Sequence, residues 1–241
     1  ASRRKGLAKI LSKAFLSCLY HSLRFVEVVF SCRFIVLLSV LVGCLRTSPP
    51  AFAAEFGDIE LSIYALGGWP RDESIFNQET TVPGSIQEGY GAGLKAGLFP
   101  AALHRMVGLQ IDSNAHGGTL SFPNIAGGRT HGTGRSSLLV LNTTFNLILR
   151  YPGEQIRPYV GIGVGWSHGT LLNPNIAGRD DKDFDSARAL GHQFLGGGQV
   201  FLNSKVFLFG EYRYFSANYH WEGLAMDFRT HYGLIGIGLR F

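Results

Sequence analysis

Histidines and an acidic run are the residues of this chain that could most directly bind a metal. The histidines outside the regular apolar patterns are His116, His131, His168 and His220. The acidic run extends from Asp180 to Asp185. Imidazole and carboxylate groups bind divalent metals, but here no two histidines have tight ligand spacing, and the run lacks the glycine and distal glutamate of a calcium loop. We therefore expect solvated loop residues and no metal site.

Two serines raise the question of hydrolysis at a membrane face. Ser113 and Ser216 resemble the nucleophile of the lipid A deacylase barrels, in which a histidine two residues earlier is the base. Those earlier positions hold Ile111 and Tyr214 in this chain. Because a serine without a base is a weak nucleophile, the sequence predicts no catalytic residue, no cofactor site and no enzyme.

The elements that position these residues are short segments in which apolar and polar residues alternate. This period of two is typical of β-strands, and no segment after residue 53 sustains a helical apolar period. The predicted strands are 59–69, 88–99, 105–113, 137–151, 157–167, 190–202, 206–215 and 230–241. In segment 137–151 the second face is too polar for the core of a water-soluble protein.

The connections between these strands alternate in length. Segments 100–104, 152–155 and 203–205 are short, whereas segments 70–87, 114–136, 168–189 and 216–227 are long. Outer-membrane barrels have an even number of strands, short periplasmic turns and longer outer loops. The pattern therefore predicts an all-β, eight-stranded antiparallel up-and-down transmembrane β-barrel with periplasmic termini and extracellular loops.

The last strand predicts how the barrel closes. Its apolar face consists of Ile235, Ile237, Leu239 and Phe241. An amphipathic strand at the chain end would leave an open sheet edge unless it paired with the first strand. A terminal aromatic residue on such a strand also resembles the insertion signal of bacterial outer-membrane barrels, which implies the barrel-insertion machinery as a partner.

Three motifs extend this resemblance over residues 54–241. They are Arg-Pro-Tyr-Val-Gly-Ile-Gly-Val-Gly at 157–165, Phe-Gly-Glu-Tyr-Arg-Tyr at 209–214 and Leu-Arg-Phe at 239–241. With them the chain resembles the small eight-stranded outer-membrane β-barrel family that includes the OmpA transmembrane domain and the opacity proteins. The resemblance implies a porin-family surface protein of the Gram-negative outer membrane, surrounded by lipid and lipopolysaccharide. Unlike full OmpA, this protein is expected to carry no peptidoglycan-binding domain after the barrel.

Alternation also predicts which charged residues face the lumen. They are Glu60, Lys95, Asp112, Arg150, Glu211, Arg213 and Arg240. Charges inside a narrow barrel must pair or stay hydrated, so we expect a structural salt-bridged plug, with inward glycines making room for the long cationic side chains. A catalytic or conducting charge cluster is the alternative.

The N-terminal segment 1–53 differs in composition from the rest. It holds eight of the 22 basic residues, one of the 17 acidic residues and all three cysteines, so residues 54–241 are slightly acidic. Net charge therefore gives no support to nucleic-acid binding. The apolar run 34–45, followed by Ala51-Phe52-Ala53, predicts a signal peptide cut before Ala54, with the barrel domain at 54–241. A helical anchor over 28–45 and a lipoprotein site at Cys44 are alternatives.

Two function classes fit these expectations. The first is an outer-membrane surface protein with a filled lumen, acting in envelope integrity or in contact with a surface ligand through its loops. The second is a narrow channel or small-solute transporter. They differ in whether the lumen is closed.

Overall fold

The structure of the chain is a computed structural model, which describes residues 57–77, 80–87, 89–126, 129–172 and 184–241. The predicted signal segment and Asp180–Asp183 lie outside these residues. No helix in the described ranges has the length and apolar character needed to cross a membrane.

Ten β-strands make up nearly all of the described chain. They are β1 (Gly57–Pro70), β2 (Glu73–Asn77), β3 (Thr80–Gln87), β4 (Gly89–Pro100), β5 (Val107–Ala126), β6 (Arg129–Arg150), β7 (Ile156–Leu172), β8 (Phe184–Phe201), β9 (Val206–Trp221) and β10 (Leu224–Arg240). One short 3-10 helix, η1 (Ala101–Leu103), lies between β4 and β5.

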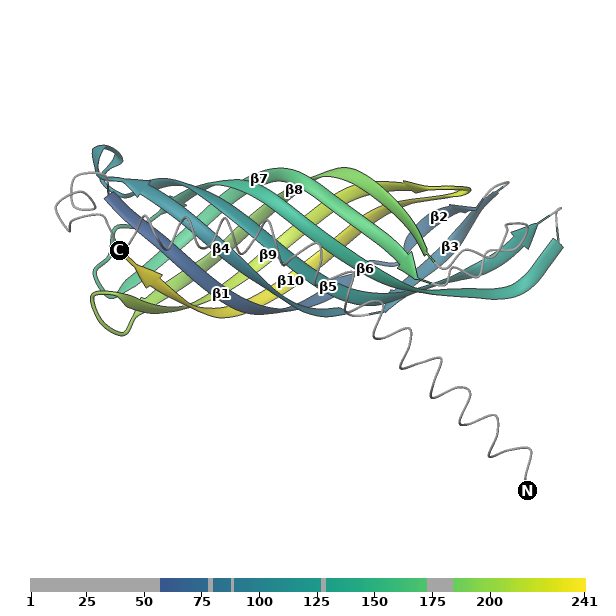
Figure 1. Cartoon of the computed structure of the whole chain (residues 1–241), viewed down its shortest axis with the longest axis horizontal. Helices are drawn as coiled ribbons and strands as arrows, with labels where there is room; N and C mark the ends of the chain where they lie inside the picture. The colour runs from purple at the N-terminus through teal and green to yellow at the C-terminus, as the bar shows by residue number, and fades with distance from the viewer. Residues whose placement is uncertain (1–56, 78–79, 88, 127–128, 173–183) are drawn as a thin grey trace, which may run out of the picture. The chain divides into compact units, whose positions relative to one another are not determined.

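The strands form a closed antiparallel ring, with β1 paired to both β4 and β10 (Figure 1). Strand β2 continues the path begun by β1, and β3 leads into β4, so the ten strands correspond to eight barrel strands. The chain therefore has the predicted eight-stranded up-and-down barrel fold, which the sequence pattern identified correctly.

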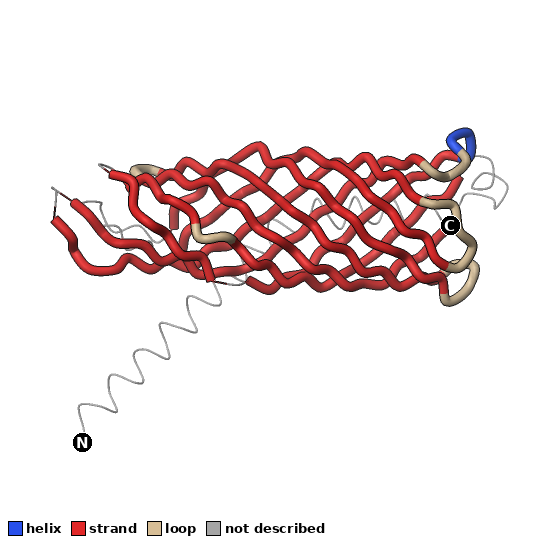
Figure 2. Tube along the Cα trace, turned by 180° about the vertical axis from the view of Figure 1, so that it is seen from behind, coloured by secondary structure: helices blue, strands red, loops and turns tan. Residues whose placement is uncertain are grey.

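The ring closes through the strand at the end of the chain. Strand β10 pairs with β1 from Glu60↔Arg240 to Pro70↔Thr230. Beyond this ladder, the Phe241 amide donates to the Ile59 carbonyl at 2.9 Å, and the Ile59 amide donates to the Phe241 carbonyl at 3.2 Å. Figure 2 shows the short connections at the same end of the barrel as the C-terminus. The last residue thus takes part in closing the sheet.

An apolar band surrounds the outside of the barrel. On β7 it contains Val160, Ile162, Val164 and Trp166, which are each more than half exposed. Aromatic residues lie near its two ends, with Tyr151 and Phe241 at the short-turn end and Trp69 and Trp166 at the other. Such a band with aromatic borders fits the hydrocarbon core and interfaces of a bilayer.

The prediction of four long outer loops was largely wrong. Segment 70–87 contains β2 and β3, and most described residues of the other three segments belong to extensions of β5 to β10. The physical reason is that the polarity of the two strand faces is reversed above the apolar band, where the inner face is apolar and the outer face is polar. Ala217, Tyr219 and Trp221 face inward and are buried, whereas Asn218 and His220 face outward and are exposed. A strand with an apolar inner face and polar outer face does not match the pattern of the membrane segments.

The closing strand gives a direct prediction. Replacing Leu239 and Phe241 together by Ser removes two outward apolar side chains and weakens the strand that seals the ring. Each large apolar side chain contributes about 1.5–3 kcal/mol when buried in an apolar phase. We expect the heat-modifiable band shift of the folded barrel to be lost in gel electrophoresis. The control is Leu147→Ser with Leu149→Ser on β6, where apolar surface is also lost; equal behaviour of both variants would contradict a special role for the terminal strand.

Candidate functional site

The lumen is the candidate site, and its short-turn end contains the first ion cluster. We call Asp58, Glu60, Arg150 and Arg157 the mouth cluster. Arg150 donates to Asp58 at 2.6 Å and also to Glu60, and Arg157 donates to Asp58 at 2.9 Å. Gln199 donates to the second Glu60 oxygen at 2.7 Å. The four charges therefore form one connected network across β1, β6 and β7.

Aromatic rings and further cations complete this end of the lumen. The Arg150 guanidinium lies 3.6 Å from the centre of the Phe99 ring, and the Arg157 and Arg240 guanidinium groups lie 4.6 and 4.5 Å from that of Phe201. Arg105 contacts Asp58 at 3.1 Å. Stacking on aromatic faces stabilises guanidinium groups that have lost part of their hydration.

A second ion cluster lies deeper in the barrel. We call Lys95, Asp112, Glu211 and Arg213 the central cluster. Lys95 contacts Glu211 at 2.6 Å, and Arg213 contacts Glu211 at 2.7 Å and Asp112 at 2.8 Å. The four side chains are almost completely buried, and their two positive and two negative charges balance. The cluster joins β4, β5 and β9 across the lumen.

Hydroxyl and amide groups satisfy the remaining oxygens of the central cluster. Tyr64 donates to Asp112 at 2.7 Å, Tyr159 donates to Glu211 at 2.8 Å, and the Asn114 amide donates to Asp112 at 3.1 Å. A buried ion pair is stable only when such additional hydrogen bonds compensate for its lost hydration. The arrangement therefore has the composition of a structural plug.

Two inward glycines make room for aromatic rings beside these clusters. A Cβ atom at Gly93 would lie 2.4 Å from the Tyr64 hydroxyl, and one at Gly238 would lie 2.2 Å from the Phe207 ring. The sequence had suggested that inward glycines make room for arginine and lysine. At these two positions the space is instead occupied by tyrosine and phenylalanine, which pack next to the charged groups.

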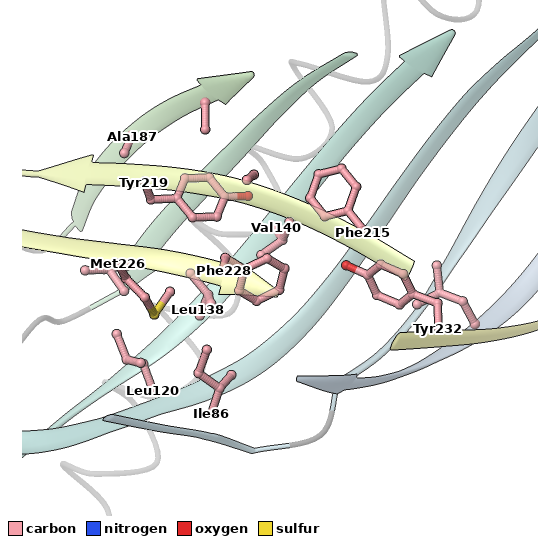
Figure 3. Close-up of a cluster of buried hydrophobic side chains, with 14 of the residues drawn as sticks. Ile86, Leu120, Leu138, Val140, Ala187, Phe215, Tyr219, Met226, Phe228 and Tyr232 are labelled. Carbon is pink, nitrogen blue, oxygen red and sulfur yellow. The ribbon is translucent and has the colours of Figure 1, made fainter. Parts of the chain in front are cut away.

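The outer part of the lumen is apolar (Figure 3). We call its buried side chains the outer apolar cluster; members include Ile86, Leu120, Leu138, Val140, Ala187, Phe215, Tyr219, Met226, Phe228 and Tyr232. Between this cluster and the central ions, Ser167 hydrogen-bonds with both Asn142 and Tyr219. Along the lumen, the described buried polar side chains thus change from ion clusters to amides and hydroxyls, and the outer apolar cluster follows.

The predicted lumen residues occupy different positions in these layers. Lys95, Asp112, Glu211 and Arg213 meet in the central cluster, and Glu60 and Arg150 meet in the mouth cluster. Arg240 lies at the rim, where it donates to the Ser204 carbonyl at 2.7 Å and is 3.9 Å from Asp58. Ile235, Ile237, Leu239 and Phe241 all face outward, and Ile235 is 72% exposed.

Sequence reasoning missed two members of the mouth cluster. Asp58 has the same parity as Glu60, and Arg157 has the same parity as Tyr159, so alternation could have identified both. The predicted first strand begins at Ile59, one residue after Asp58, and Arg157 is the first residue of its predicted strand. The structure includes both side chains in the ion network.

The structure shows where the residues considered for metal binding and for hydrolysis lie. His116 is a buried inward residue of β5, with its Nε2 2.6 Å from the Tyr232 hydroxyl, and is not a loop residue. Within the described residues, no three metal-binding side chains of the His, Cys, Asp or Glu type lie together. Ser113 contacts Thr143 at 3.2 Å. Ser216 has His192 opposite it on β8, a neighbour from another strand that spacing along one strand does not reveal.

Among the described residues, the pairing of β1 with β4 does not continue directly into the pairing of β2 with β3, and we call this place the lateral gap. In the described residues, β1 pairs with β4 as far as Gly68↔Gly89, and β2 pairs with β3 from Glu73↔Gly84. Segments 70–72 and 85–87 are not paired to each other between these points. Behind the gap lies a cavity of about 10 Å³ lined by residues including Pro70, Ile86, His116, Leu138 and Phe228. This volume is about that of one water probe.

Comparisons with known proteins agree on the fold. No family model matches the chain, and no curated protein matches it. Among solved structures, the outer membrane protein OprG from Pseudomonas aeruginosa shares 15% identity at a TM-score of 0.56, covering 78% of this chain and 97% of OprG. The outer membrane protein AlkL, solved in DMPC lipid bilayers, shares 15% identity at a TM-score of 0.51, covering 78% of this chain and 91% of AlkL. The chain therefore has the fold of small outer-membrane β-barrels.

The central cluster gives a prediction about stability. Arg213→Gln removes the cation that contacts both Asp112 and Glu211, and breaking a buried ion pair costs about 3–5 kcal/mol. We expect urea unfolding in lipid vesicles to show a loss of this size. Arg240→Gln, at the partly exposed rim, is the matched control and should cost about 1 kcal/mol or less. Equal losses of unfolding free energy in the two variants would show that the central cluster stabilises the barrel no more than the rim does.

Proposed function

We propose that this protein is an outer-membrane barrel with a closed lumen, which strengthens the envelope and presents its outer end for contact with surface ligands. The observation that carries the proposal is the filling of the lumen by two buried ion clusters and the outer apolar cluster. A closed lumen favours a role that depends on the outside of the barrel.

The proposed location rests on the outer surface of the barrel. The exposed apolar band with aromatic ends matches a bilayer, and the closed ring pairs the strands that carry this band with one another. In this location, the surrounding molecules are outer-membrane lipids and lipopolysaccharide, and the barrel-insertion machinery would act on Ile235, Ile237, Leu239 and Phe241. The strands that continue beyond the band would extend outside the cell.

The role that we propose is non-enzymatic. The buried carboxylates of the central cluster each contact a cation and a hydroxyl group, so they have no free position for a substrate. Neither Ser113 nor Ser216 is hydrogen-bonded to a histidine among the described contacts. We therefore assign the lumen residues a structural role.

Conductance measurements test the closed lumen. Purified protein in planar bilayers should show no steady current, because packed ion pairs leave no continuous water path. Replacing Arg150 and Arg213 together by Ser should open space in both ion clusters and leave Glu60 and Asp112 without their main partners. We expect that double variant to leak and to unfold at a lower temperature. Large, stable, ion-selective currents from the unmodified protein would overturn the proposal in favour of a channel.

A second candidate function is passage of small apolar solutes through the lateral gap. The observation that favours it is the position of the gap beside the outer apolar cluster. Its edge contains Pro70, which has no amide hydrogen to donate to a ladder. An apolar solute that entered there would meet Ile86, Leu138 and Phe228, which line the cavity.

Tryptophan quenching distinguishes the two candidates. The chain has three tryptophans, and Trp69→Phe with Trp166→Phe leaves Trp221, which is buried inside the barrel. A bromoalkane in the bilayer should leave Trp221 fluorescence unchanged if the lumen is closed. The control retains only Trp166, which faces outward and should be quenched. Strong quenching of Trp221 would instead support the entry of apolar solutes.

A further inference from the structure

The outer face of β7 and β8 carries an ordered series of side chains just above the apolar band. Three successive cross-strand pairs are Trp166↔Leu190, His168↔Arg188 and Thr170↔Ser186. These side chains face outward, because the intervening residues Ser167, Gly169, Ala187 and Ala189 are buried. From the band outward, the surface therefore changes from apolar and aromatic groups to basic groups and then to hydroxyl groups.

The lowest pair lies at the border of the band. Trp166 is 57% exposed and Leu190 is 72% exposed. Below them come the exposed pairs Val164↔His192 and Ile162↔Phe194. Tryptophan is favoured at the level where a bilayer changes from acyl chains to headgroups. The next pair, His168 and Arg188, is therefore at headgroup level.

The middle pair places two basic side chains opposite each other. Directly opposed residues on antiparallel strands have Cβ atoms about 4.5–5.5 Å apart, and like charges at this spacing repel. Partial burial and, to a smaller degree, the Arg188 guanidinium hold the pKa of His168, which lies above the band, below its ordinary value. The two groups thus interact electrostatically, and an anion bound between them would remove the repulsion.

The described residues of strands β6 to β8 add no outward-facing acid to this surface, and the outward-facing residues at the outer end of β9 are Asn218 and His220. On β6, the residues opposite His168 and Thr170 are Leu141 and Leu139. No outward-facing side chain of β6 to β8 above Trp166, among those described, is acidic. Within the same residues, Arg188 makes no ion pair. The Thr170 and Ser186 hydroxyl oxygens are 3.0 Å apart and lie directly above the basic pair, where they can donate to an oxygen-rich group.

We propose that this surface binds the phosphate of a phosphorylated glycolipid of the outer leaflet. Arg188 and protonated His168 contact the phosphate, Thr170 and Ser186 face the hydroxylated headgroup, and the acyl chains lie along Trp166, Leu190 and the band below. Guanidinium groups bind phosphate oxygens through charge-assisted hydrogen bonds. The inference rests on the proposed outer-membrane location, and it adds a specific lipid site to it.

Lipid retention by the folded barrel tests this site. The protein is inserted into phosphatidylcholine nanodiscs that contain a diphosphorylated glycolipid, and the bound glycolipid is measured by native mass spectrometry. Removing one charge-assisted contact to phosphate with Arg188→Gln should weaken retention about tenfold. Arg188→Lys should restore part of it. The control is Arg135→Gln, which removes an exposed outward cation from β6.

The pH dependence gives a second measurement. Binding of an anion favours protonated His168, so retention should increase as pH falls through the range in which His168 takes up its proton. Arg188 is the only charged described residue that faces His168 from β6 or β8, and this increase should disappear in His168→Gln. Equal retention by Arg188→Gln and Arg135→Gln would overturn the proposal, as would equal retention of a glycolipid without phosphate. Competition by inorganic phosphate as strong as that by the lipid would assign the site to free phosphate instead.

The heat-modifiable band shift, measured in pure phosphatidylcholine, distinguishes failure of the lipid site from failure of the proposed function. All variants should fold there, because the substituted side chains lie on the outer surface. Normal folding without glycolipid selectivity would remove the lipid site and leave the closed barrel intact. Failure of the unmodified protein to insert into bilayers would overturn the proposed function itself.

Discussion

Closure of the sheet by β1 and β10 is the constraint on which the other features depend. An unpaired backbone group inside a bilayer costs several kcal/mol, so a membrane-spanning sheet is stable only as a ring. The ladder from Glu60↔Arg240 to Pro70↔Thr230 completes that ring with the last strand of the chain. Once the ring is closed, alternate residues must face either the lumen or the outside. The sorting of charged and apolar side chains follows from this geometry.

The lumen illustrates how a narrow ring accommodates its inward residues. Charges there can be stable only if each has a partner, and the central cluster satisfies this with two cations, two carboxylates and the hydroxyls of Tyr64 and Tyr159. Further out, the inward residues become apolar, as in a water-soluble barrel. This change coincides with the end of the outer apolar band, because beyond it the outside of the barrel is polar. The two faces therefore exchange character at the membrane border.

The outside of the barrel and its interior point to complementary roles. The proposed surface role rests on the packed ion and apolar clusters of the interior, and the proposed lipid site rests on the series from Trp166 to Ser186. The lateral gap is the place where interior and exterior approach each other, since the wall there lacks pairing between residues 70–72 and 85–87. The register with the flanking strands also changes by one residue on each side of the gap: Pro70↔Thr230 is followed by Ile75↔Met226, and Gln87↔Thr119 by Gly91↔His116.

Alternation and connection lengths by themselves predicted the eight barrel strands and their antiparallel order. Alternation also predicted the inward direction of residues such as Lys95 and Glu211, because side-chain direction in a strand depends only on parity. It failed for 70–87 and 216–227 because the polarity of the two faces is reversed there. In 70–87 the register also changes by one residue. Only the tertiary structure decided that Arg213 contacts both Asp112 and Glu211, that His116 is buried against Tyr232, and that Arg188 faces His168. Those contacts depend on the register between strands that are distant in sequence, and parity along one strand contains no information about register.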